Sequence, residues 1–101
     1  MQLFETENGK LLLRALAALS DEAECRDFLE DLLTGREIES ISQRLAVARL
    51  LLADGRYAEI EQRTGASSAT IGRVNRCILY GSGGYRRVLE KLGAPEGEDK
   101  A

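Results

Sequence analysis

Arginine is the residue type whose distribution along this chain points most directly to chemistry. Residues 56–87 contain six arginines, no lysine and two acidic side chains, Glu59 and Glu61. The guanidinium group presents N–H donors in a planar fork that matches phosphate oxygens or the edge of a guanine. The segment is therefore a candidate for contact with a polyanion, and a solvated basic face is the alternative.

The division of charge along the chain reconciles this candidate with a net acidic protein. The formal net charge is −3, to which residues 1–55 contribute −5, residues 56–87 contribute +4 and residues 88–101 contribute −2. Phosphate binding responds to the local field rather than to the total charge, so the middle segment remains the candidate interface.

Residues 57–79 have the pattern of two short helices joined by a tight turn at Gly65. A glycine is favoured there because it adopts a positive φ at little cost. Ile60 in the first helix, with Ile71 and Val74 in the second, is spaced to face inward. This layout is typical of a helix-turn-helix, whose second helix enters the DNA major groove.

A helical hairpin that touches no nucleic acid is the alternative interpretation of the same pattern. The motif usually has a small residue at its fifth position, where the second helix crosses, and this chain has Glu61 there. Gly72 within the second helix costs about 1 kcal/mol relative to alanine. Close approach of DNA or contact with another helix would each account for that glycine.

The side chains of this segment divide into candidate base readers and candidate backbone contacts. Serine hydroxyls donate or accept hydrogen bonds, an alanine methyl suits thymine, and arginine reaches guanine or phosphate. The candidate base readers are Ser67, Ser68, Ala69, Gly72 and Arg76. The candidate phosphate contacts are Arg56, Tyr57, Arg63 and Arg73.

The elements that must position these residues are predicted to be helices throughout. Leu, Ala, Glu and Arg are abundant and no strand-like alternation occurs, which predicts an all-α fold in a single domain, residues 1–101. A first helix is expected over about residues 10–19. Ser20 is expected to cap the second helix, whose first turn is acidic. Thr34 and Glu37 form a capping box that begins a third, long helix.

The long helix is expected to be the central packing element and to contact a second subunit. Its first apolar face steps by three and four residues, and a second apolar flank lies beside it, which is more than a lone amphipathic helix can cover. The first face is Ile38, Ile41, Leu45, Ala48 and Leu52, and the flank is Val47, Leu50 and Leu51. A core helix of a monomer is the alternative.

The C-terminal part is predicted to contain one short helix and a tail. The glycine-rich run 81–84 breaks the preceding helix, a helix follows over about residues 85–92, and the charged tail from 93 to 101 is expected to be disordered. The glycine-rich run is not expected to be a nucleotide loop, because it follows a helix rather than a strand and lacks the lysine.

Composition argues against an enzyme, a metal site and a membrane protein. The chain has no histidine and no nucleophile elbow, and its acidic pairs fit solvated helix faces. Cys25 and Cys77 lack metal-ligand spacing and are expected to be reduced thiols in or near the core. No signal peptide, transmembrane run or lipidation motif is evident, so a cytoplasmic protein without a cofactor is expected.

The segment from Leu32 to Asn75 resembles the Trp repressor superfamily. The similarity lies in Leu32-Leu33-Thr34, Arg44, Leu51-Leu52, Gly65-Ala66, Ala69-Thr70-Ile71 and Arg73. The runs Val74–Cys77 and Tyr80–Tyr85 look more like its YerC/YecD branch of TrpR-related proteins. The resemblance implies a six-helix chain, an intertwined homodimer, and helix-turn-helix readers (about residues 56–80) facing successive major grooves roughly 34 Å apart.

The resemblance also implies an effector pocket between the long helix and the recognition helix. The positions that match the corepressor-binding residues of the Trp repressor are Thr34, Arg44, Thr70, Arg73, Val74 and Cys77. Val74 replaces a small glycine beside the ligand ring, and Cys77 replaces a serine that contacts the ligand amine. L-Tryptophan is therefore not the expected ligand. A different small corepressor is one alternative; the other is no effector, with Arg44 pairing with an acidic neighbour.

These observations predict a sequence-specific transcriptional regulator that binds double-stranded DNA at a near-palindromic operator as a homodimer, and that acts as a repressor. The alternative is a helical dimeric interaction or small-molecule-sensing module that does not bind DNA.

Overall fold

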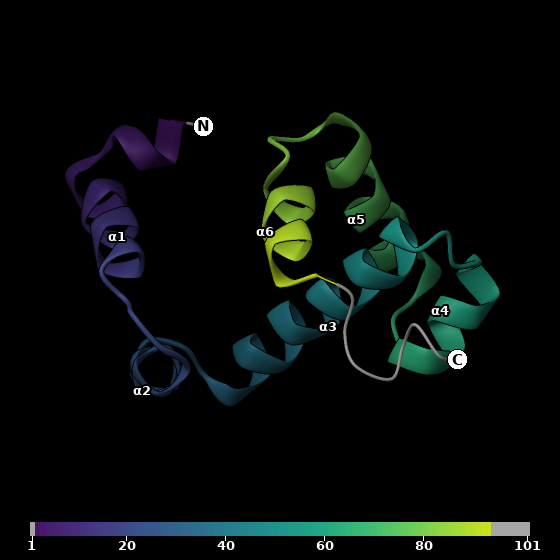
Figure 1. Ribbon diagram of the computed structural model, residues 1–101, viewed down its shortest axis with the longest axis horizontal. Coiled ribbons are helices and arrows are strands. Elements are labelled where there is room, and N and C mark those ends of the chain that lie inside the picture. Colours follow the sequence, from purple (N-terminus) through teal and green to yellow (C-terminus); the bar gives the residue numbers. More distant parts are fainter. Residues whose placement is uncertain (1, 94–101) are drawn as a thin grey trace. The chain divides into compact units, whose positions relative to one another are not determined.

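The computed structural model describes residues 2–93, which are helical throughout apart from turns. A short 3-10 helix, η1, precedes six α-helices (Figure 1). Their bounds are η1 Gln2–Glu5, α1 Glu7–Ala17, α2 Glu22–Leu32, α3 Gly35–Leu52, α4 Tyr57–Thr64, α5 Ser68–Tyr80 and α6 Gly84–Leu92. The predicted all-α, six-helix fold is confirmed, and residues 94–101 of the predicted tail lie outside the described residues.

The N-terminal ends of the first two α-helices differ from the prediction. The Thr6 side chain accepts a hydrogen bond from the Gly9 N–H at 3.0 Å, so α1 starts at Glu7 instead of residue 10. The cap of α2 is Asp21, whose carboxylate accepts from the Glu24 N–H at 2.8 Å. Ser20 was the wrong residue for this cap, because its own N–H donates back to the Glu24 carboxylate at 2.8 Å. The cap of α2 therefore lies one residue later than expected.

The start of α3 follows the prediction. The Thr34 N–H donates to the Glu37 carboxylate at 2.8 Å, and the Glu37 N–H donates to the Thr34 hydroxyl at 3.1 Å. This reciprocal pair satisfies two donors that the helix itself leaves free. The helix ends at Leu52, before Asp54, which has a positive φ of 64°.

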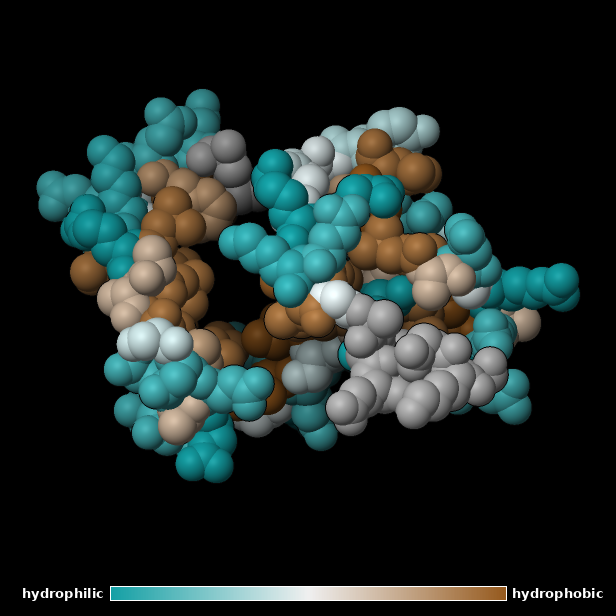
Figure 2. Space-filling model, in the orientation of Figure 1, coloured by the Kyte–Doolittle hydropathy of each residue, from teal (hydrophilic) through white to brown (hydrophobic). Residues whose placement is uncertain are grey.

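The chain forms two compact units, one ending at Ile38 and the other beginning at Glu39. Among the described residues of the first unit none is buried. Its helices instead expose large apolar side chains, visible along α1 in Figure 2. The most exposed on α1 and α2 are Leu11 at 58%, Leu32 at 49%, Leu13 at 44% and Leu16 at 42%.

The second unit contains the buried core. Its buried apolar residues are Val47, Ala48, Leu50, Ile60, Ala66, Ile71 and Val74. Leu51, Ile78, Tyr85 and Leu89 pack against them. The core thus joins α3, α4, α5 and α6, and it holds the segment between residues 57 and 80 on one side of the long helix. On α3, Leu45 stays 45% exposed and is left outside this core.

Candidate nucleic-acid interface and effector cavity

A left-handed glycine connects α4 to α5. Gly65 follows the last residue of α4 with φ 73° and ψ 4°, and its N–H donates to the Glu61 carbonyl at 2.9 Å. A residue with a Cβ would be strained in this conformation. The helix-turn-helix predicted at Gly65 is therefore present, with a turn of three residues before Ser68.

Hydrogen bonds within the motif and one from the long helix α3 stabilise this turn. The Thr64 hydroxyl donates to the Ile60 carbonyl at 2.7 Å and accepts from the Ala66 N–H at 3.1 Å. From α3, the Gln43 amide nitrogen donates to the Thr64 carbonyl at 3.1 Å. Sequence reasoning missed both Gln43 and Thr64, because no local pattern relates two residues that lie 21 positions apart.

The inward-facing residues of the motif lie where the spacing placed them. Ile60 and Ile71 are fully buried, and Val74 is 1% exposed. Glu61 departs from the usual motif, but it is exposed, so its carboxylate remains in water. The small residue that is buried at this turn is Ala66, at 4% exposure.

The outer face of α5 carries small side chains, one of them a serine, together with two arginines. Ser68, Ala69, Arg73 and Arg76 are exposed, and Gly72 is partly exposed. Within residues 2–93, neither arginine has a hydrogen-bond or ion-pair partner. Both positive charges are therefore available to a ligand from outside the chain.

Ser67 differs from its neighbour Ser68 because its hydroxyl is already engaged. It caps α5, accepting from the Thr70 N–H at 3.2 Å and forming a second hydrogen bond with the Thr70 hydroxyl at 3.1 Å. Capping of this kind contributes about 1 kcal/mol to a helix. The Ser68 hydroxyl has no hydrogen bond among the described residues.

The remaining candidate phosphate contacts lie around α4. Arg56 is the residue at the N-cap of α4, and its side chain makes no capping hydrogen bond. Tyr57 is 41% exposed, and Arg63 in the last turn is exposed.

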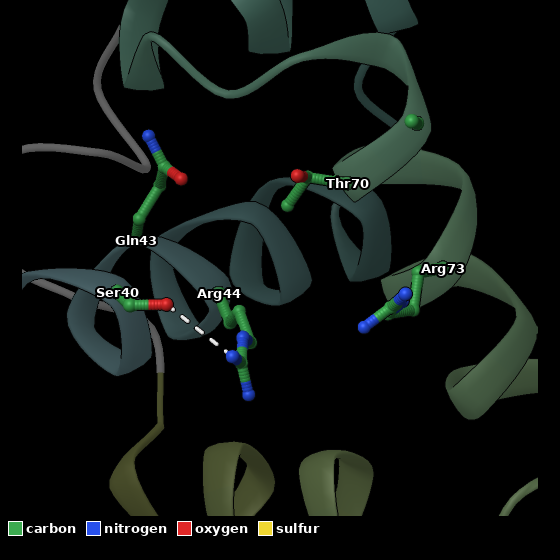
Figure 3. A pocket seen from close by; sticks show the side chains of 6 residues that line it. Ser40, Gln43, Arg44, Thr70 and Arg73 are labelled. Carbon is green, nitrogen blue, oxygen red and sulfur yellow. Dashed lines mark hydrogen bonds between the residues drawn. The ribbon is translucent and has the colours of Figure 1, made fainter. Parts of the chain in front are cut away.

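A cavity of about 220 Å³ separates α3 from the first turns of α5 (Figure 3). Figure 3 shows Arg44, from α3, and Arg73, from α5, on either side of this space. The lining residues are Ser40, Gln43, Arg44, Ala69, Thr70 and Arg73. No acidic side chain lines it, so the two guanidinium charges are not neutralised there. Of the predicted pocket residues, this cavity brings together Arg44, Thr70 and Arg73.

The predicted ion pair between Arg44 and an acidic neighbour is wrong. The Arg44 guanidinium donates to the Ser40 hydroxyl at 3.3 Å, and it has no ion pair within residues 2–93. The residues one helical turn from Arg44 are Ser40 and Ile41 on one side and Val47 and Ala48 on the other, none of them acidic.

The other predicted pocket residues have different positions. Val74 is buried in the core and does not line the cavity. Cys77 is exposed, which corrects the expectation of a thiol in or near the core, while Cys25 is half-buried; both are free thiols. The Thr34 hydroxyl is used in the cap of α3.

The described part of the chain has no candidate membrane span and no candidate metal cluster. None of its helices combines the length and the apolar character that a bilayer crossing requires. None of its His, Cys, Asp and Glu side chains gather in a group of three or more that could hold a metal ion.

Comparisons with known proteins agree with this geometry. Residues 7–93 match the family described as Trp repressor protein. The chain is 43% identical over 90 residues to the uncharacterised protein YerC of Bacillus subtilis (strain 168), covering 89% of this chain and 86% of that protein. A TrpR-like protein from Eubacterium eligens superimposes with a TM-score of 0.88 at 45% identity, covering 95% of this chain and 99% of that chain. A candidate Trp repressor from Staphylococcus aureus gives 0.86 at 38% identity, covering 94% and 97%.

The family of the chain follows from its structure and from its sequence. The structure has a left-handed turn at Gly65 above the buried Ile60 and Ile71, and the sequence matches the family over residues 7–93. The chain belongs to the Trp repressor family of DNA-binding regulators, as a TrpR-related, YerC-like protein.

Proposed function

We propose that this protein is a sequence-specific transcriptional regulator, acting in the cytoplasm as a repressor that occupies a near-palindromic operator as a homodimer. The observation that carries the proposal is the outer face of α5. It combines small side chains with Arg73 and Arg76, which have no partner among the described residues, and it directly follows the Gly65 turn. Such a helix fits a major groove, where small side chains permit close approach and cations meet phosphate.

The candidate contacts fall into two groups with different consequences. Ser68, Ala69, Gly72 and Arg76 are proposed to face base edges, because they share the exposed side of α5. Arg56, Tyr57, Arg63 and Arg73 are proposed to contact the phosphate backbone. Ser67 is assigned to capping in place of base reading, since its hydroxyl is occupied by Thr70.

A second copy of the chain is the proposed cover for the apolar surface of the first unit. Leu11, Leu13, Leu16 and Leu32 are each more than two-fifths exposed. Burying apolar area is worth about 25 cal/mol per Å², so a unit with no buried described residue gains greatly from a partner. A two-fold dimer would present two α5 helices to one face of the duplex, with half-sites roughly 34 Å apart.

The cavity between α3 and α5 is the proposed effector site, for a small anion rather than tryptophan. Arg44 and Arg73 supply positive charge, and Ser40 and Thr70 supply hydroxyl groups. Apart from Ala69, the lining side chains are polar or charged, and the two guanidinium groups favour a ligand that carries negative charge. Val74 and Cys77, the two positions whose side chains argued against tryptophan, do not line this space, so the proposal of a small anion rests on Arg44 and Arg73.

A mobility shift with genomic DNA fragments, repeated over a range of salt concentrations, tests the proposal. We expect retardation near physiological salt that weakens as salt rises, with a linear dependence of log affinity on log salt. The rival function is a dimeric interaction or sensing module that does not bind DNA. Absence of any retarded species, from a protein confirmed to be a folded dimer, would favour the rival.

A further inference from the structure

We infer that Gln43 is a positioning residue for DNA recognition: its amide tethers the helix-turn-helix to the long helix and so fixes the direction in which α5 leaves the turn. The inference rests on the proposed function, because it assigns Gln43 a role in the same DNA-binding surface without contact to DNA.

The tether joins α3 to the end of α4. The Gln43 amide nitrogen donates to the Thr64 carbonyl at 3.1 Å, in a partly buried position. Thr64 is the last residue of α4, and the carbonyl of a last residue receives no N–H hydrogen bond from within its own helix. The Gln43 amide therefore supplies the missing donor to the Thr64 carbonyl. Because the bond is partly buried, water competes less for either group.

The position of this bond in the motif makes it a positioning contact. Gly65, one residue after Thr64, reverses the chain in the left-handed conformation, and α5 begins at Ser68. The two hydrogen bonds of the Thr64 hydroxyl are made within the motif, to Ile60 and Ala66. The Gln43 bond comes from outside the motif, so it ties the turn to the helix that carries the core residues Val47 and Ala48.

The Gln43 amide has a donor nitrogen and an acceptor oxygen, and these two ends point in different directions. Figure 3 shows its nitrogen directed away from Thr70 and its oxygen on the side of the cavity. The oxygen has no hydrogen bond within residues 2–93, so the Thr64 carbonyl is the one described partner of this amide. Removing the donor thus removes the tether and leaves the cap of α5 at Ser67 and the core unchanged.

Three variants of the full-length protein test the inference. Gln43→Met keeps the unbranched length and removes the donor. Gln43→Glu keeps the shape and places a carboxylate against the Thr64 carbonyl, near the negative end of α4. The matched control is Gln62→Met, which alters an exposed glutamine of α4 that has no hydrogen bond among the described residues.

The first readout is amide hydrogen exchange at Gly65 and Ala66, whose N–H groups donate to the Glu61 carbonyl and the Thr64 hydroxyl. In Q43M we expect exchange at these two amides to rise about five- to tenfold, the range expected for loss of one hydrogen bond. Exchange in the core of α3 should stay as in the wild type. In Q43E the rise should be larger, and in Q62M it should be absent.

The second readout is affinity for a genomic fragment that the wild type retains, measured at several salt concentrations. Q43M should bind about five- to tenfold more weakly with an unchanged salt slope, because the phosphate contacts are kept and only the fit of α5 to the base edges is lost. A purely structural role predicts faster exchange throughout the chain instead, and no loss of affinity at temperatures where the variant is fully folded.

The outcomes separate the inference from the proposed function. Unchanged exchange at Gly65 and Ala66 in Q43M, or an equal rise in Q62M, overturns the tether. Faster turn exchange with unaltered affinity overturns the positioning role. A wild-type protein that binds no DNA overturns the proposed function and with it the positioning role, and the exchange data still decide the tether.

Discussion

Arg44 and Ser40 lie one turn apart on α3, and the Arg44 guanidinium donates to the Ser40 hydroxyl at 3.3 Å. A neutral partner orients this guanidinium without cancelling its charge. Arg73 flanks the same cavity from α5, again without an acidic residue in the lining. Two positive charges therefore face a space of about 220 Å³, and an anion placed there would be attracted to both helices.

Replacing Arg44 with Gln should reduce the affinity of this cavity for anions. With inorganic phosphate as the probe, we expect wild-type protein to be stabilised by about 1.4 kcal/mol at ten times the dissociation constant, because a ligand that binds the folded state adds RT ln(1 + [L]/Kd). Thermal unfolding at several phosphate concentrations measures the effect, and R44Q should lose most of it. Arg36→Gln, at an exposed position of α3, is the control. Equal stabilisation of both variants would contradict anion binding in the cavity.

Replacing Arg73 with Ala should weaken binding to all DNA sequences alike. Because Arg73 is assigned to phosphate, each dimer loses two such contacts, and the slope of log affinity against log salt should flatten by about 2. Affinity at physiological salt should fall about tenfold or more. Mobility shifts over a salt series measure both quantities, with Arg26→Ala on α2 as the control for a lost exposed charge. An unchanged slope would remove Arg73 from the set of phosphate contacts.

Replacing Ser68 with Ala should change sequence preference rather than overall affinity. A lost base-edge hydrogen bond is worth about 1–3 kcal/mol of discrimination at one base-pair position. Selection of bound fragments from genomic DNA measures the preference. Ser67→Ala is the matched control: it should lower the free energy of unfolding by about 1 kcal/mol through loss of the α5 cap, with the preference retained. If S67A alters the preference and S68A does not, the two roles are exchanged.

Replacing Gly72 with Ala should stabilise the fold and weaken DNA binding. A Cβ built at Gly72 meets no described atom within 4 Å, so contact with another helix of the described chain does not require the glycine. The substitution should add about 1 kcal/mol to the free energy of unfolding. Denaturant unfolding and mobility shifts measure the two effects. A variant that is more stable and binds DNA as well as wild type would show that DNA does not approach closely at this residue.

Features set by local chemistry could be predicted from the sequence. The Thr34–Glu37 capping box, the left-handed Gly65 and the burial of Ile60 depend on residues a few positions apart, and each was found as expected. The helix starts at Glu7 and Glu22 were misplaced, because threonine, serine and aspartate compete for one cap and small differences in geometry decide between them.

Features that depend on packing between distant segments could not be predicted. The Gln43–Thr64 tether and the place of Ser40 in the cavity require α3 to lie against α4 and α5 in one register. The Cys77 side chain lies on the exposed side of α5, whereas its apolar neighbours on the helix suggested the core. Periodicity along one helix identifies a face, but which partner covers that face is decided by the tertiary structure.

Hydroxyl-radical footprinting of the wild-type protein on a selected genomic fragment tests the central claim most directly. A two-fold dimer that inserts α5 into successive major grooves predicts two protected patches on one side of the duplex, with centres roughly 10 base pairs apart. A single patch, or no protection by a folded protein near physiological salt, would contradict the account.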